Sequence, residues 1–280
     1  MSELEALLLG IVQGLTEFLP ISSSGHLILV PWLQEYHFLQ DNEAFNKTFD
    51  VALHAGTLAA VLIYFRVEIA RMLRALWESL RRRGVGGAQE RLAWAIVVGT
   101  IPAVIAGGLG ESFIEDHLGD PWQIAILMIV FGLLLGYADR RPQRESLEEV
   151  GPRQGLYIGL AQVLSLAPGV SRSGITITAA RFLGLDRDSA ARISFLLLAP
   201  VTAGAVVYKG YRAISEGLPH HVAGPMIVGT IAAAVSGYLA IAGLLAFVRR
   251  RSYDVFVVYR VLLGVTVLLL IATGVRGATF

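Results

Sequence analysis

Two short polar stretches interrupt the apolar runs of this chain, and the first lies near its start. It reads QGLTEFLPISSSGH over residues 13–26. Gln13 and Glu17 are four residues apart, so on a helix they share one face. Side-chain oxygens paired in this way suit a hard cation such as Mg²⁺ or Ca²⁺, or can orient a water molecule. The alternative role for Gln13 is a hydrogen bond between membrane helices.

The same stretch carries a histidine and a run of three serines. His26 titrates near neutral pH and can transfer protons, and Ser23 can act as a nucleophile or donate to a phosphate. We therefore expect both residues to be catalytic. Ser22 and Ser24 are candidates for binding the substrate, although hydroxyl groups at a helix start commonly serve only as N-caps.

The second stretch reads LAPGVSRSGIT over residues 166–176. Arg172 offers planar, paired donors that match a phosphate, and an arginine within an apolar segment is functional by default. The alternative is a purely structural ion pair between Arg172 and Glu17. Hydroxyl groups and a helix N-terminus add further donors to an anion. The remaining substrate-binding candidates of this stretch are Ser171, Ser173, Gly174 and Thr176.

Together these residues would form an anion clamp, an acid/base group and a carboxylate with or without a metal. Phosphoryl transfer to water fits this set, because positioning and charge neutralisation dominate that reaction. His54 lies one helical turn after Asp50 in another apolar run, and we expect these two to pair with each other rather than to be catalytic.

The composition is that of an integral membrane protein. Hydrophobic residues make up 55% of the 280 residues and charged residues only 16%, against about 25% in soluble domains. The net charge of +1 implies no affinity for polyanions, so nucleic acid is not an expected partner. There is no cysteine, which excludes disulfides and thiolate metal sites.

Apolar runs long enough to cross a bilayer predict an all-α polytopic membrane protein with about six full transmembrane helices. The spans are expected at about 50–66, 92–110, 122–138, 190–209, 222–248 and 254–275. Alternate connections hold 17 of the 23 lysines and arginines, which places those connections in the cytoplasm and both termini outside. The arginine-rich connection 66–91 is expected to form an amphipathic helix on the inner surface, or an ordinary solvated helix.

Residues 3–34 and 153–184 are apolar but broken in the middle, and each half is too short to cross. We expect each to enter the membrane, turn and leave on the same side. A shift of 149 residues aligns Gly, Gln, Leu and Ser positions of the two, and the charge pattern makes them enter from opposite sides. The prediction is one membrane domain, 1–280, with an inverted repeat of about 1–138 and 153–280 whose breaks meet near the midplane.

These motifs closely resemble the undecaprenyl-diphosphate phosphatase family, also known for bacitracin resistance. The family patterns (E/Q)-x-x-x-E and P-G-x-S-R-S-x-x-T read here as QGLTE at 13–17 and PGVSRSGIT at 168–176. FLPISSSGH and FDVALHAGTLAAVLIYF are also similar to the family, and the resemblance covers essentially the whole chain. Position 13 is Gln where some members have Glu.

The resemblance implies hydrolysis of undecaprenyl diphosphate to the monophosphate, which recycles the lipid carrier for cell-wall synthesis. It also implies a divalent cation, Mg²⁺ or Ca²⁺, held by Glu17 with Gln13, and a diphosphate held by Arg172. His26 and Ser23 would serve as proton carrier or nucleophile. The family is placed in the bacterial inner membrane; the partners are the polyprenyl diphosphate and membrane lipids, with a homodimer among the open oligomeric states.

Two other functions stay open at this point. A lipid-phosphate transporter or flippase would use the same inverted-repeat site, because broken helices are typical of transporters. A phosphatase of the PAP2 type is suggested by SSGH at 23–26 alone, but Thr178 stands where that family needs a histidine.

Overall fold

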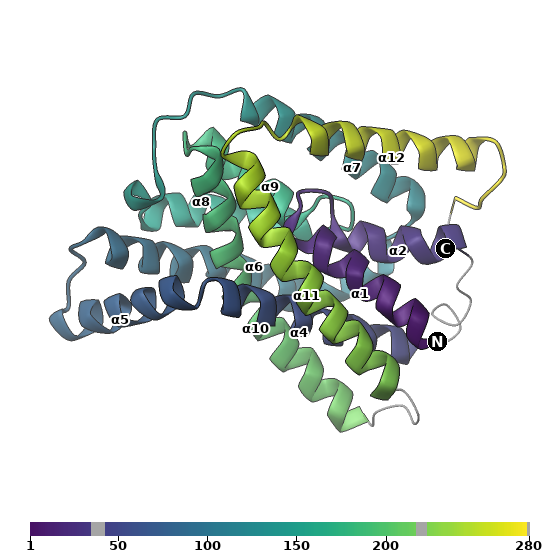
Figure 1. Cartoon of the computed structure of the whole chain (residues 1–280), viewed down its shortest axis with the longest axis horizontal. Coiled ribbons are helices and arrows are strands. Elements are labelled where there is room, and N and C mark those ends of the chain that lie inside the picture. The colour runs from purple at the N-terminus through teal and green to yellow at the C-terminus, as the bar shows by residue number, and fades with distance from the viewer. Residues whose placement is uncertain (35–42, 217–222, 279–280) are drawn as a thin grey trace.

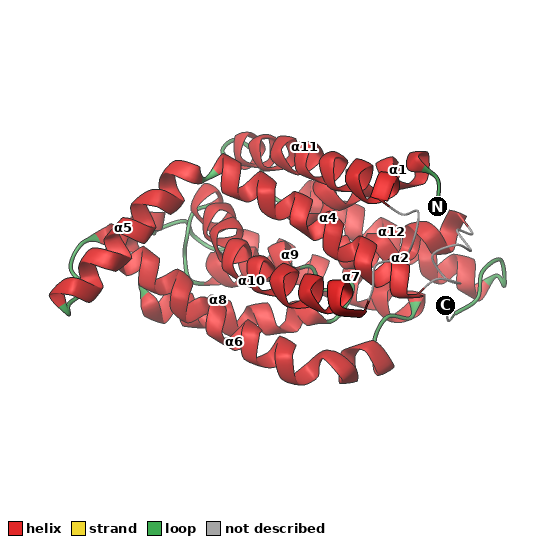
Figure 2. Cartoon of the chain, turned by 90° about the horizontal axis from the view of Figure 1, so that it is seen from below, coloured by secondary structure: helices red, strands yellow, loops and turns green. Residues whose placement is uncertain are grey.

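The computed structural model describes residues 1–34, 43–216 and 223–278, and its regular elements are helices (Figure 2). The shorter helices near the breaks are α1 (Glu3–Phe18), α2 (Ser23–Gln34), α8 (Pro152–Val163), α9 (Arg172–Phe182) and the 3₁₀ turns η1 (Leu147–Glu149) and η2 (Leu164–Leu166). The longer helices are α4 (Glu43–Tyr64), α5 (Arg66–Arg82), α6 (Ala88–His117), α7 (Pro121–Asp139), α10 (Arg187–Glu216), α11 (Ala223–Val248) and α12 (Asp254–Ala272).

Five of these helices are long and apolar enough to cross a membrane by themselves, namely α6, α7, α10, α11 and α12. The sixth expected span corresponds to α4, which passes the same test together with α5 across a bend of 79°. The protein is therefore a multi-pass membrane protein, as the sequence predicts. The apolar span within α6 is Ala88–Gly110, and the helix continues beyond it to His117.

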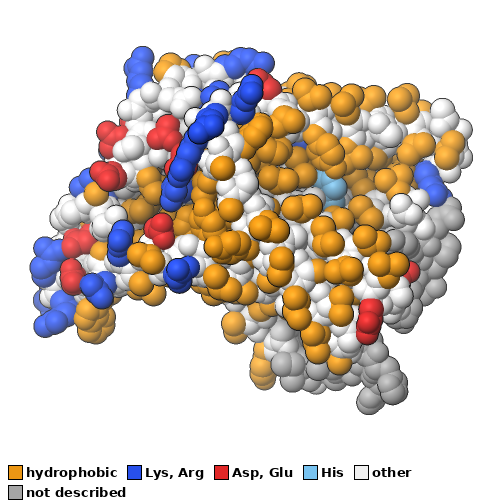
Figure 3. All heavy atoms as spheres, in the orientation of Figure 1, with side chains coloured by type: hydrophobic (Ala, Val, Ile, Leu, Met, Phe, Trp, Pro, Cys, Tyr) orange, Lys and Arg blue, Asp and Glu red, His pale blue; other side chains and the backbone are white. Residues whose placement is uncertain are grey.

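Charge is distributed unevenly over the molecule. The N- and C-terminal ends of the chain lie near each other at one end (Figure 1), whereas lysine and arginine side chains gather over α5 and the half of the molecule opposite the termini (Figure 3). The amphipathic character expected for this segment is present in α5, which exposes Leu73 and Trp77 among its arginines. This distribution follows the one that the positive-inside rule expects of a membrane protein.

The first halves of the two broken segments each pack along a long helix through small residues. α1 lies against α11, where a Cβ added to Gly10 would come within 2.4 Å of the Gly229 carbonyl oxygen. α8 lies against α6, where a Cβ on Gly159 would come within 2.2 Å of the Gly99 carbonyl oxygen. Small residues let membrane helices approach this closely. The short half-helices are therefore fixed in place by neighbours that do cross the membrane.

A buried ion cluster lies at the C-terminal end of α7. The Asp139 carboxylate accepts from Arg187 Nε (2.7 Å) and from the Tyr253 backbone N–H (3.1 Å). Arg181 of α9 lies 3.4 Å from the same carboxylate and is completely buried. This cluster joins α7, α9, α10 and the start of α12 without touching either break.

Candidate active site at the junction of the two broken segments

The first break is formed by residues 19–22, between the end of α1 and the start of α2. Ser22 has a φ of 78°, in the left-handed region that a residue with a side chain adopts only at a cost of about 1–3 kcal/mol. Its Oγ accepts from the Gly25 backbone N–H (3.3 Å) and so caps α2. The turn therefore reverses the chain within a very short distance and aims the first turn of α2 back toward α1.

The second break, residues 167–171, has the same local structure. Ser171 has a φ of 73°, and its Oγ accepts from the Gly174 backbone N–H (3.1 Å) at the start of α9. The 149-residue shift aligns Ser22 with Ser171. Ser22 thus has the capping role that the sequence left as an alternative to substrate binding, and Ser171, expected only to bind substrate, caps its helix in the same way.

The two breaks touch each other, as the sequence predicts. The Gly169 backbone N–H donates to Ser22 Oγ (3.1 Å), and Ser173 Oγ donates to the Leu19 carbonyl oxygen (3.0 Å). Each bond links one break to the other across about 150 positions of sequence. A serine in each segment thus holds the turn of the opposite segment.

Glu17 is at the centre of the side chains that the two breaks bring together. Its Oε1 accepts from Arg172 Nη2, and its Oε2 accepts from Ser23 Oγ and from Gln13 Nε2, the last at 3.3 Å. The Glu17 side chain is 4% exposed and that of Arg172 is 16% exposed. The carboxylate is therefore closed off inside the protein, whereas the Arg172 side chain remains partly exposed. The ion pair that the sequence left as an alternative exists, and it joins the carboxylate predicted for the metal or water to the predicted anion clamp.

Arg172 has a second partner that the sequence did not identify. Its Nη1 donates to Thr202 Oγ1 of α10 (3.2 Å). A threonine in an apolar helix gives no signal of its own, because its hydroxyl group can always bond to the backbone of the preceding turn. With Glu17 on one side and Thr202 on the other, the planar guanidinium is held in one orientation.

His26 lies at the junction but faces away from Glu17. Its Nδ1 is 2.7 Å from the Ser22 carbonyl oxygen and its Nε2 is 2.6 Å from the hydroxyl of Tyr259 on α12. The two rings are stacked, with centroids 5.7 Å apart. Both ring nitrogens are therefore engaged within the protein, and the catalytic role expected for His26 stays a prediction.

The other predicted residues divide between the surface and the interior. Ser24 is exposed, with its Oγ 3.5 Å from that of Ser22. Thr176 is fully buried behind Arg172, where its Oγ1 donates to the Arg172 carbonyl oxygen (2.7 Å). Gly174 is buried as well. The structure thus leaves Ser24 at the surface and gives Thr176 and Gly174 packing positions.

The pair expected on α4 is present. His54 Nδ1 is 3.4 Å from Asp50 Oδ1 and 2.8 Å from the Asp50 carbonyl oxygen. His54 also lies close enough to Glu17 for their charges to interact. This adds a further polar side chain near the carboxylate, from α4, to the three that bond to it.

The oxygens near Glu17 can be compared with what a divalent cation needs. Gln13 Oε1 is buried and has no hydrogen-bond partner in the described part of the chain. It lies on the same helix face as the Glu17 carboxylate, and together they form a donor set of hard oxygens. Within the described residues no group of three or more His, Cys, Asp or Glu side chains could hold a metal. The residues therefore fit a cation that takes its remaining ligands from phosphate and water, as Mg²⁺ commonly does.

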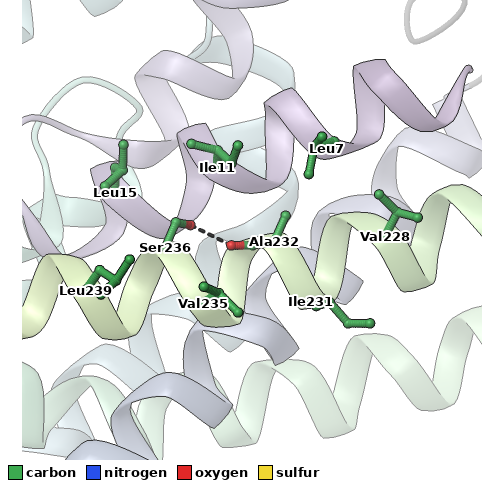
Figure 4. A pocket seen from close by; sticks show the side chains of 9 residues that line it. All are labelled: Leu7, Ile11, Leu15, Val228, Ile231, Ala232, Val235, Ser236 and Leu239. Atoms are coloured by element: carbon green, nitrogen blue, oxygen red, sulfur yellow. Dashed lines mark hydrogen bonds between the residues drawn. The ribbon is translucent and has the colours of Figure 1, made fainter.

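An apolar groove of about 600 Å³ runs along the outside of α1, between that helix and α11 (Figure 4). Leu7, Ile11 and Leu15 line it from α1, and Val235 and Leu239 are among the residues that line it from α11. Leu15 is two residues before Glu17. The helix that supplies the buried carboxylate therefore presents a continuous apolar track on its other face.

Comparison with known proteins places this geometry in a family. The chain is 50% identical over 270 residues to a protein of Geobacter sulfurreducens named undecaprenyl-diphosphatase, covering 96% of this chain and 98% of that one. It is 46% identical over 277 residues to a protein of the same name from Thermomicrobium roseum, covering 96% and 98% of the two chains. The family described as bacitracin resistance protein BacA matches residues 6–266, which include both breaks. The chain belongs to the bacitracin resistance protein BacA family.

Proposed function

We propose that this protein hydrolyses undecaprenyl diphosphate to undecaprenyl phosphate and inorganic phosphate, and so recycles the lipid carrier for cell-wall synthesis. The relatives named undecaprenyl-diphosphatase support the reaction. One observation carries the proposal: Arg172, directly after the second break, donates to the Glu17 carboxylate. Ser23, directly after the first break, donates to the same carboxylate. Phosphoryl transfer needs a cationic hydrogen-bond donor for the phosphate, a base, and a hydroxyl group from which that base can take a proton.

Arg172 binds the diphosphate. Its side chain is partly exposed, and Thr202 and Glu17 fix the plane of the guanidinium, so its donors meet the phosphate oxygens in one orientation. Ser24, exposed at the start of α2, is placed to donate a further hydrogen bond. The N-termini of α2 and α9 both begin at this junction and favour negative charge there.

Glu17 acts as the base. It accepts the proton of Ser23 Oγ, which then forms a bond to the terminal phosphorus, while the bond from that phosphorus to the bridging oxygen breaks and undecaprenyl phosphate leaves. Water then hydrolyses the phosphoserine and releases phosphate. If a water molecule takes the place of the serine oxygen, the same carboxylate receives its proton in a single displacement.

Gln13 Oε1 and the Glu17 carboxylate would hold the Mg²⁺ or Ca²⁺ that this family resemblance implies. When bound, the cation neutralises charge on the diphosphate oxygens. Gln13 also donates to Glu17, which keeps the carboxylate oriented between Arg172 and Ser23.

The lipid chain of the substrate stays in the hydrocarbon, along the groove between α1 and α11. The substitution Ile11→Trp tests this location. It should raise the KM for undecaprenyl diphosphate and leave the KM for geranyl diphosphate unchanged. Equal effects on both substrates would remove the groove from the proposal. The arginine-rich end faces the cytoplasm of a bacterial inner membrane, and both termini are periplasmic.

The function is tested by release of inorganic phosphate from undecaprenyl diphosphate by the purified full chain in detergent with Mg²⁺. We expect release by the unmodified protein and none above background with Arg172→Ala. Movement of the lipid diphosphate across vesicle membranes without phosphate release would instead favour a transporter.

A further inference from the structure

Arg260 of α12 is a completely buried cation that lies inside the apolar run VFVVYRVLLG. Each hydrogen bond that it makes in the described structure goes to a backbone carbonyl oxygen. Nε donates to Met128 (3.0 Å), and Nη1 donates to Pro20 (3.3 Å). Nη2 donates to Gly169 (2.8 Å) and Val170 (3.0 Å). A buried guanidinium must satisfy its donors, and this one does so with carbonyls from three different segments.

Two of these segments are the breaks themselves. Pro20 lies two residues before Ser22, and Gly169 and Val170 come directly before Ser171. Ser22 and Ser171 are the two serines with left-handed backbone conformations. Such conformations persist only where the surroundings hold them. Charge-assisted hydrogen bonds to the preceding carbonyls are a strong restraint of this kind, and one side chain applies it to both turns.

The neighbouring glycines leave the space that this guanidinium occupies. A Cβ added to Gly132 of α7 would lie 3.1 Å from Arg260 Cβ. A Cβ added to Gly174 of α9 would lie 2.8 Å from Arg260 Nη1 and 3.0 Å from Ser171 Cβ. Gly174, a substrate-binding candidate from the sequence, is therefore placed where a side chain would displace the arginine.

We propose that Arg260 is a positioning residue for the phosphatase site: it holds the two breaks in register, so that Glu17 and Ser23, which flank the first break, meet Arg172, which follows the second. It contacts the turns and none of the reacting groups. The catalytic effect of this register rests on the proposed function, whereas the restraint on the two turns can be tested without it.

The kinetic test compares Arg260→Lys with Arg181→Lys in the full chain. A lysine keeps the charge but has three donors on one nitrogen instead of the planar fork that spans both breaks, and a misplacement of about 1 Å can cost about 100-fold in rate. We expect kcat per folded molecule to fall about 100-fold for Arg260→Lys, with KM within about threefold because Arg172 is unchanged. Arg181 is equally buried but belongs to the Asp139 cluster, so its variant should keep kcat per folded molecule.

A second pair of variants leaves the arginine in place. Gly174→Ala should lower kcat at least about tenfold by displacing Arg260 and Ser171. Gly243→Ala on α11, where nothing lies within 4 Å of the added Cβ, is the matched control and should have no effect. This pair decides the kinetic question if Arg260→Lys does not fold.

A third measurement reads the turn without any activity. The chain has no cysteine, so Val170→Cys, at a residue that is 1% exposed, introduces a single thiol in the second break. We expect a methanethiosulfonate reagent to label it about tenfold faster when Arg260→Lys is added, and no faster when Arg181→Lys is added. If the unmodified protein releases no phosphate, the proposed function fails and the labelling alone tests the restraint. Unchanged labelling, or unchanged kcat in the folded Arg260→Lys and Gly174→Ala variants, overturns the proposal.

Discussion

Replacing Glu17 by Gln removes one charge and almost no volume from the centre of the junction. In the structure this carboxylate accepts hydrogen bonds from Arg172, Ser23 and Gln13. An amide keeps one oxygen but turns an NH₂ group toward a donor, so Arg172 and Ser23 can no longer both be satisfied. The variant therefore loses the proposed base and leaves the guanidinium without its counter-ion.

The expected loss of activity follows from the base. A general base contributes about 100- to 10,000-fold, so we expect kcat/KM to fall about 1,000-fold, equivalent to about 4 kcal/mol of transition-state stabilisation. When the cation is saturating, Gln13→Ala costs the long hydrogen bond of 3.3 Å to the carboxylate, worth about 1 kcal/mol, so its loss of activity should be about fivefold.

The expected loss of stability follows from the ion pair. Removing one partner of a buried pair costs about 3–5 kcal/mol. Because the Arg172 side chain is 16% exposed, we expect the lower end of that range. The double variant Glu17→Gln with Arg172→Met removes both charges, so it should recover most of the thermal stability and none of the activity.

The assay is steady-state phosphate release from undecaprenyl diphosphate, combined with thermal unfolding of the same detergent-purified samples. The unmodified protein and Gln13→Ala serve as controls. A rate loss below tenfold for Glu17→Gln, or a larger loss for Gln13→Ala, would refute the assignment of Glu17 as the base. A double variant no more stable than Glu17→Gln would refute the account of the ion pair.

The remaining predictions concern the nucleophile, the cation and the membrane surface. With substrate labelled on its terminal phosphate, rapid quenching should trap label on the protein, and Ser23→Ala should abolish it; a protein that turns over without label uses water directly. Chelation should abolish phosphate release, Mg²⁺ or Ca²⁺ should restore it, and Gln13→Ala should raise the concentration needed for half-activity; an unchanged requirement removes Gln13 from the cation site. The side chain of Trp77 on α5 is 63% exposed, and we expect brominated lipid to quench its fluorescence. This fluorescence is measured as the difference between the unmodified protein and Trp77→Phe. Quenching by aqueous acrylamide instead would place α5 in solvent.

The sequence predicts the membrane helices well because each apolar run carries its own signal. The interruptions of residues 3–34 and 153–184 also predict two turns at depth, and the turns are present. The span expected at 92–110 agrees with the apolar part of α6, Ala88–Gly110, and the helix itself continues to His117 because acidic residues do not end a helix whose preceding turns are already formed. The sequence predicts that the two breaks meet, but not which of their residues bond to each other.

The partners were beyond the sequence because they depend on elements far apart in the chain. His26 was expected beside Glu17, yet it stacks on Tyr259 of α12, a contact fixed by packing of that helix. Thr202 gave no signal at all. Arg260 did give one, a cation in the middle of an apolar run, but the sequence alone does not say that its partners are carbonyl oxygens of both breaks.

The two breaks have the same turn but different reactive residues. The 149-residue shift aligns Ser22 with Ser171, and both adopt the same left-handed turn and cap the helix that follows. The same shift aligns Glu17 with Leu166, Ser23 with Arg172 and His26 with Ile175. The residues that shape the turns are thus alike in both halves, whereas the residues with chemistry differ. Because a carboxylate and hydroxyl from one half meet a guanidinium from the other, neither half could carry out the proposed reaction alone, and the restraints that hold the turns in register become part of the catalytic apparatus.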